Sequence, residues 1–113
     1  MAVVRKEDGT VVCARCVVAD SAWTRSKGLL GRASLDEDDG ILLRPGGSIH
    51  MFFMRFSIDA VFLDTELRVL RVAADLKPWR MASKRGAKAV LELPAGRCAR
   101  VGVQEGERLV LVD

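Results

Sequence analysis

Five polar residues that can act together on a small molecule lie in three separate segments of the sequence: Arg32, His50, Arg55, Asp59 and Glu92. Arginine offers a planar fork of donors that fits a carboxylate or a phosphate. Histidine can donate or accept a hydrogen bond near neutral pH. We therefore predict that the five residues form a pocket for a small anion. The alternative is a buried structural network, in which Arg55 and Asp59 pair around a strand connection.

Catalysis by the histidine is a second hypothesis for the same residues. General acid–base catalysis needs a carboxylate within hydrogen-bond reach of the imidazole, and Asp59 or Glu92 would supply it for His50. The nucleophile of such a hydrolase-type enzyme would be Ser48 or Ser57. Neither serine lies in a nucleophile-elbow motif, so the sequence favours binding over hydrolysis.

Cys13 and Cys16 are spaced like the ligands of a zinc knuckle. Valines flank the pair on both sides and favour a strand, where residues three apart point to opposite faces. A zinc site would also need Cys98 and His50, and redox chemistry would favour a helix N-terminus. We therefore expect no metal and no cofactor, and cysteines that pack as small apolar side chains.

A basic segment near the C-terminal third is read as a loop from Lys77 to Gly86, followed by Lys88. Trp79 within it offers a ring on which a base can stack. The net charge of +3 and the aromatic content of 5% are low for a dedicated nucleic-acid-binding protein. We predict a small anionic ligand or a protein as the partner, and neither nucleic acid nor a membrane.

The apolar run from Ser48 to Asp64 is the segment that must position these residues. It holds all four phenylalanines and the single histidine. Its apolar residues fall on both parities, which is typical of strands covered on both faces. We expect two strands here, near 49–53 and 59–63.

The other expected elements surround this run. Asp8-Gly9 predicts a hairpin whose second strand continues through Cys13 to Val18. A helix is expected from Ala22 to about Arg32, and a helical turn between 95 and 101. Further strands are expected at 41–43, 67–73, 89–93 and 108–112, with an acidic turn at 36–40. The fold class is mostly β (α+β), a small closed or nearly closed barrel with one or two short helices packed outside.

Length and composition fit one β-rich domain over residues 1–113. Half of the residues are apolar, enough for a core without disulfides, and three cysteines are an odd number for a disulfide framework. The N-terminus carries charges early, and no run is as long as a membrane span. These features predict a cytoplasmic protein.

Three blocks of the sequence resemble the family known as domain of unknown function 192. The first is Lys27-Gly28-Leu29-Leu30-Gly31-Arg32, the second runs from His50 to Asp64, and the third is Val90-Leu91-Glu92-Leu93-Pro94-Ala95-Gly96 with Gly102-Val103 and Gly106-Glu107. The chain departs from the family pattern at Ser57, at Glu107 and in the turn at 64–66. The resemblance implies a compact β-rich domain found in bacteria and archaea, with no assigned activity. We therefore expect a bacterial accessory module that binds a ligand or a partner.

Overall fold

β-Strands dominate the computed structural model, which describes residues 1–19, 34–51 and 54–113. The strands of the N-terminal half are β1 (Ala2–Arg5), β2 (Val11–Cys13), β3 (Arg15–Ala19), β4 (Asp39–Leu43) and β5 (Ser48–His50). Those of the C-terminal half are β6 (Ile58–Leu63), β7 (Val69–Leu76), β8 (Met81–Ser83), β9 (Ala89–Pro94) and β10 (Leu109–Val112), and the helix α2 spans Arg97–Val101. The helix predicted from Ala22 lies outside the described residues.

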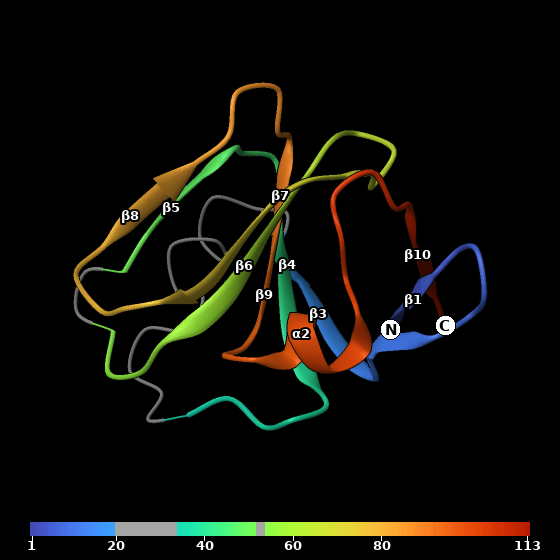
Figure 1. Cartoon of the computed structure of the whole chain (residues 1–113), viewed down its shortest axis with the longest axis horizontal. Helices are drawn as coiled ribbons and strands as arrows, with labels where there is room; N and C mark the ends of the chain where they lie inside the picture. Colours follow the sequence, from blue (N-terminus) through green and yellow to red (C-terminus); the bar gives the residue numbers. More distant parts are fainter. Residues whose placement is uncertain (20–33, 52–53) are drawn as a thin grey trace.

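The strands form three sheets that remain open (Figure 1). Five strands lie in the order β3-β4-β9-β6-β7, with β3 and β4 parallel and the other neighbours antiparallel. A second sheet has the order β10-β1-β2, and β5 pairs with β8 in a two-stranded ribbon. The mostly β class is confirmed, whereas none of the sheets in the described residues closes into a barrel, so the predicted barrel is not supported. The apolar residues on both parities reflect layers packed on both faces of one open sheet, and no barrel closure is needed to cover them.

The two central strands of the large sheet are buried along their whole length. Every residue of β6 and of β9 is buried, which confirms the expectation of a strand covered on both faces at 59–63. Alternate residues enter two different cores. The α2-side core includes Val12, Cys13, Cys16, Val61, Leu63, Leu91, Leu93, Cys98 and Leu109. The ribbon-side core includes Ile41, Ile49, Met51, Met54, Ile58, Ala60, Phe62, Ala73 and Val90.

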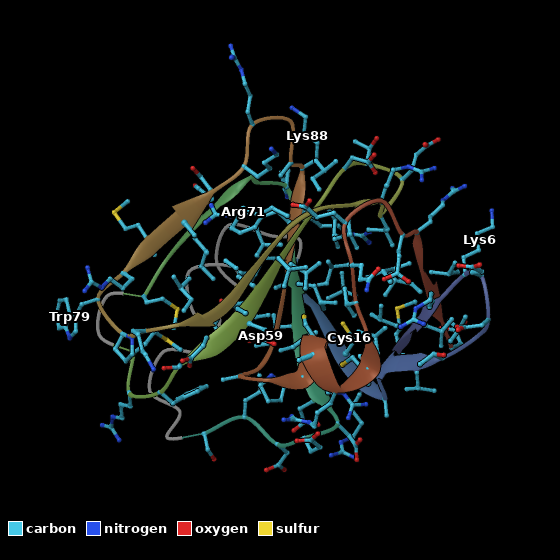
Figure 2. The ribbon with its side chains drawn as sticks, viewed as in Figure 1. Lys6, Cys16, Asp59, Arg71, Trp79 and Lys88 are labelled. Atoms are coloured by element: carbon cyan, nitrogen blue, oxygen red, sulfur yellow. The ribbon has the colours of Figure 1, made fainter. Side chains whose placement is uncertain are left out.

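Arg71 connects the ribbon to the large sheet. It lies opposite Phe62 in the β6–β7 pair, and its guanidinium carbon is 5.7 Å from the centre of the Phe62 ring. Its Nη1 donates to the carbonyl oxygen of Ser83 in β8 at 2.7 Å. Figure 2 shows this side chain between β7 and the ribbon. One side chain therefore joins the ribbon to the face that it covers.

The N-terminal hairpin forms as predicted, but its second strand is shorter. Gly9 has a φ of 74°, and Asp8 accepts the N–H of Thr10 at 2.9 Å, which closes the turn between β1 and β2. The chain then bends at Ala14, and the following residues join the large sheet as β3. The prediction of one strand through Val18 is wrong because this bend transfers the chain from one sheet to another.

The C-terminal elements follow the prediction closely. The helical turn appears as α2, which ends at Gly102 with a φ of 74°, a conformation that glycine adopts without steric cost. The last strand appears as β10 beside β1. None of the helices in the described ranges has the length and apolar character needed to cross a lipid bilayer.

Replacement of Gly40 by alanine tests how closely β4 approaches its neighbours. An added Cβ would lie 2.7 Å from Cys13 Sγ and 3.1 Å from the carbonyl oxygen of Glu92. We expect Gly40→Ala to lower the free energy of unfolding by about 1–3 kcal/mol, as overpacking does. Urea unfolding followed by circular dichroism measures this, with the exposed Ser48→Ala as a control. Adding Cys13→Ala should recover part of the loss, and a fully additive double variant would contradict the contact.

Candidate functional site

Asp59 is completely buried, and its carboxylate accepts hydrogen bonds from main-chain N–H groups. Oδ1 accepts the N–H groups of Asp75 at 2.9 Å and Gly96 at 3.1 Å. Oδ2 accepts the N–H of Cys98 at 2.9 Å. These donors belong to β7 and to the start of α2, so one side chain joins three elements (Figure 2). Asp59 therefore acts as a structural acceptor in this fold, whereas Arg55 is exposed and the pairing of the two residues is not observed.

Glu92 lies on the opposite face of the same sheet. Asp59 pairs with Leu93, and Glu92 pairs with Ala60 on the neighbouring strand. Successive residues of a strand point to opposite faces, so Asp59 faces α2 and Glu92 faces the ribbon side. Glu92 is 4% exposed, and its Oε1 has no hydrogen-bond partner among the described residues. Burial raises the pKa of Glu92 to about 8, because desolvation disfavours the charged carboxylate.

The remaining predicted residues lie at the surface or outside the described ranges. His50 ends β5 and is exposed, whereas Ile49 and Met51 on either side of it are buried in the ribbon-side core. The imidazole therefore points away from the core that Glu92 faces. Arg55 is also exposed, and Arg32 lies outside the described residues.

The predicted residues accordingly do not converge on one pocket in the described part of the chain. Asp59 and Glu92 are separated by the sheet itself, and neither shares a face with the His50 imidazole. This arrangement does not support a dyad of His50 with either carboxylate. A ligand-binding role for the individual residues stays a prediction.

A pocket of about 350 Å³ lies elsewhere, and the sequence reasoning did not identify it. Its lining residues are Arg44, Pro45, Asp64, Thr65, Leu67, Lys88 and Ala89. They follow β4, follow β6 and begin β9, so three distant segments meet here. Arg44 follows β4 and Lys88 precedes β9, and no local pattern in the sequence predicts that these two cations meet. The pairing of β4 with β9 brings them together.

Main-chain hydrogen bonds hold the walls of this pocket. The N–H of Gly46 donates to the carbonyl oxygen of Lys88 at 3.0 Å, and the N–H of Lys88 donates to that of Leu63 at 2.7 Å. Asp64 Oδ1 accepts the N–H groups of Glu66 at 2.8 Å and Arg68 at 2.9 Å. Arg44 and Lys88 make no side-chain ion pair within the described ranges. The pocket therefore has fixed walls and two available cations.

All three cysteines are buried and free, as expected for residues that pack in a core. Cys13 and Cys16 do not point to opposite faces, however. The bend at Ala14 separates their strands, and both side chains enter the α2-side core together with Cys98. The described residues contain no group of three side chains that could hold a metal ion.

The basic segment is not a continuous loop, because it contains β8. Trp79 is 59% exposed with a φ of 69°, and Met81 is 67% exposed. Lys77 pairs with Asp75 at 2.7 Å. The segment thus displays apolar and cationic groups together, and the expectation that nucleic acid does not bind it stays a prediction.

The model of the family DUF192, described as "Uncharacterized ACR", matches residues 3–111, and the chain belongs to this family as the resemblance predicted. A "UPF0127 protein" of Thermococcus sibiricus is 34% identical over 114 residues, which cover 94% of this chain and 71% of that protein. A "UPF0127 protein" of Pyrococcus furiosus is 40% identical over 67 residues, which cover 58% of this chain and 57% of that protein. The family is uncharacterised in function, as the resemblance implied.

Two solved bacterial structures share the fold. A protein of unknown function from Novosphingobium aromaticivorans aligns with a TM-score of 0.86 and 24% identity, covering 98% of this chain and 84% of that one. A putative transcription regulator from Sinorhizobium meliloti aligns with a TM-score of 0.80 and 22% identity, covering 96% and 89%. These two structures come from bacteria and the sequence relatives above are archaeal, so the predicted bacterial origin stays a prediction.

Removal of the Asp59 carboxylate should destabilise the fold strongly. Asp59→Ala leaves three main-chain N–H groups without their acceptor, and we expect a loss of about 3 kcal/mol or more in the free energy of unfolding. Asp59→Asn keeps the shape and one carbonyl oxygen, so its loss should be smaller. Urea unfolding measures both, with the exposed Asp36→Ala as a control. Equal stability of Asp59→Ala and the control would refute the structural role.

Glu92 should make stability depend on pH. Its pKa is about 8 in the folded chain against an ordinary value of 4.5, so the folded state binds more protons between these values. Stability contributed by this group therefore falls as the pH rises from about 5 to 8, and is constant below that window. We expect Glu92→Gln to remove a fall on the order of 3 kcal/mol between pH 5 and 7.5. Urea unfolding across this range checks it, and a pH profile identical to that of wild type would contradict it.

Proposed function

We propose that this protein is a small binding module that takes a small anionic ligand in the pocket between Arg44 and Lys88. The observation that carries the proposal is the presence of two cations without ion-pair partners in the described chain, both lining a pocket of about 350 Å³. Unpaired cations at a concave surface favour an anion, because each can form a charge-assisted hydrogen bond.

The lining of the pocket narrows the class of ligand. Pro45, Leu67 and Ala89 present apolar surface beside the two cations. Asp64 adds a carboxylate whose Oδ1 already binds two main-chain N–H groups, and its negative charge disfavours a polyanion. Thr65 offers a hydroxyl that can donate or accept. These features together favour a monoanion with a short apolar part and a hydroxyl group, such as a small hydroxycarboxylate.

The pocket between Arg44 and Lys88 suits an anion better than the five residues that the sequence predicts for it. The Asp59 carboxylate accepts hydrogen bonds from main-chain donors, Glu92 is buried on the other face, and His50 and Arg55 are exposed.

A protein partner is the second candidate, because Trp79 and Met81 expose apolar surface among basic residues.

We also propose a cytoplasmic location, which three free and buried thiols support.

Binding of 3-hydroxybutyrate at constant ionic strength tests the proposed function. We expect saturable chemical-shift changes in a titration followed by heteronuclear NMR, centred on residues 44–46, 64–67 and 88–89. Arg44→Ala and Lys88→Ala should each weaken the affinity about tenfold or more, as expected for loss of a charge-assisted hydrogen bond.

Arg85→Ala is the matched control, because Arg85 is an exposed cation that does not line the pocket. It should leave the affinity unchanged. If all three variants weaken binding equally, the interaction is only a general attraction to the basic surface and the proposed pocket is wrong. Absence of saturable binding by hydroxybutyrate, acetate and inorganic phosphate would also overturn it.

A further inference from the structure

We infer that Cys13 and Cys16 form a reversible disulfide, and that this pair is a dithiol site oxidised by small peroxides. The inference concerns the α2-side core and does not depend on ligand binding at Arg44 and Lys88. It rests on where the fold places the two sulfur atoms.

The backbone brings the two thiols to one side. Cys13 ends β2, Ala14 forms a bend, and Cys16 lies in β3. In a continuous strand the two side chains would point apart. The bend removes that restriction, and both cysteines are buried in the α2-side core. Figure 2 shows Cys16 beside α2.

Gly40 leaves room for one sulfur beside the other. Cys16 and Gly40 are directly paired on the parallel strands β3 and β4. An ideal Cβ on Gly40 would lie only 2.7 Å from Cys13 Sγ. The sulfur of Cys13 therefore occupies the position that a side chain opposite Cys16 would fill. Paired residues on adjacent strands have neighbouring side chains, which places the Cys13 sulfur on the side of Gly40 that the Cys16 side chain neighbours.

The surroundings distinguish the two thiols chemically. The interaction between the two thiols raises the pKa of Cys13 and lowers the pKa of Cys16. The main-chain N–H of Leu42 and the charge of Arg44 further lower the pKa of Cys16, although burial opposes them. Cys16 is thus the better thiolate and Cys13 the proton donor. Burial and the neighbouring Asp59 raise the pKa of Cys98 to about 12, which makes that thiol inert.

The chemistry balances with hydrogen peroxide as the two-electron oxidant. The Cys16 thiolate attacks one peroxide oxygen, the O–O bond breaks, and one water leaves once the departing oxygen is protonated. The Cys16 sulfenic acid is then attacked by Cys13 sulfur, which loses its proton as the S–O bond breaks and a second water leaves. Two thiols and one peroxide give one disulfide and two waters. A dithiol reductant reverses the change by thiol–disulfide exchange.

Access and loop length indicate which oxidant fits and what the disulfide does. Cys13 is 0% and Cys16 is 5% exposed, so a small peroxide reaches them more readily than a protein disulfide. The two strands are edge strands of their sheets, where local opening is easiest. A disulfide across such a short loop stabilises a fold less than one across a long loop. The pair is therefore suited to a reversible response and less to holding the structure together.

Thiol counting in the full chain tests the inference. The reduced folded protein is treated with a small molar excess of hydrogen peroxide, quenched, unfolded in urea and alkylated with N-ethylmaleimide for intact-mass and peptide analysis. We expect two of the three thiols to be lost, a Cys13–Cys16 cross-link, and recovery of all three thiols after dithiothreitol. Cys98→Ala is the matched control and should form the same cross-link.

Three results would overturn the inference. The first is a folded chain that keeps three alkylatable thiols under conditions in which the urea-unfolded chain has formed the disulfide. The second is a cross-link that joins Cys98 to either partner. The third is loss of the remaining thiols of Cys13→Ala to peroxide as quickly as in wild type, which would show that no pairing accelerates the reaction.

Discussion

The carboxylate of Asp59 is the interaction on which the arrangement of the large sheet depends. The side chain is buried, and a charged group is costly to bury unless it is hydrogen-bonded. The three main-chain donors to this carboxylate are therefore essential. The three donors come from Asp75, which has a φ of 52°, and from the start of α2. The position of the helix against the sheet, and with it the α2-side core, follows from this one acceptor.

The two faces of the open five-stranded sheet are different chemical environments. Strands β6 and β9 are covered on both faces, so each adjacent pair of residues contributes to two different environments. Asp59 finds hydrogen bonds on one face, whereas the carboxyl group of Glu92 meets mainly apolar neighbours on the other. Residues that are close in sequence or directly paired can therefore have unrelated roles, and the cations that line a pocket come from the ends of the strands.

Local signals in the sequence predicted several features correctly for identifiable reasons. Asp8-Gly9 specifies a turn with positive φ, and apolar residues on both parities at 58–63 require cover on both faces. Burial of Cys13 and Cys16 also followed from the valines that flank them. The mostly β class and the family membership rest on the same short-range patterns.

The sequence by itself determined the strand content, the first turn, the family and the buried character of the 58–63 segment, because each depends on local propensity or on side-chain alternation. Only the tertiary structure decided that the sheets stay open, that Asp59 and Glu92 face opposite sides, and that Arg44 and Lys88 share a pocket. It also decided that a bend at Ala14 turns Cys13 and Cys16 into one core, where the Cys13 sulfur packs against Gly40. These outcomes depend on pairing between segments up to several tens of residues apart, and no local pattern encodes that register.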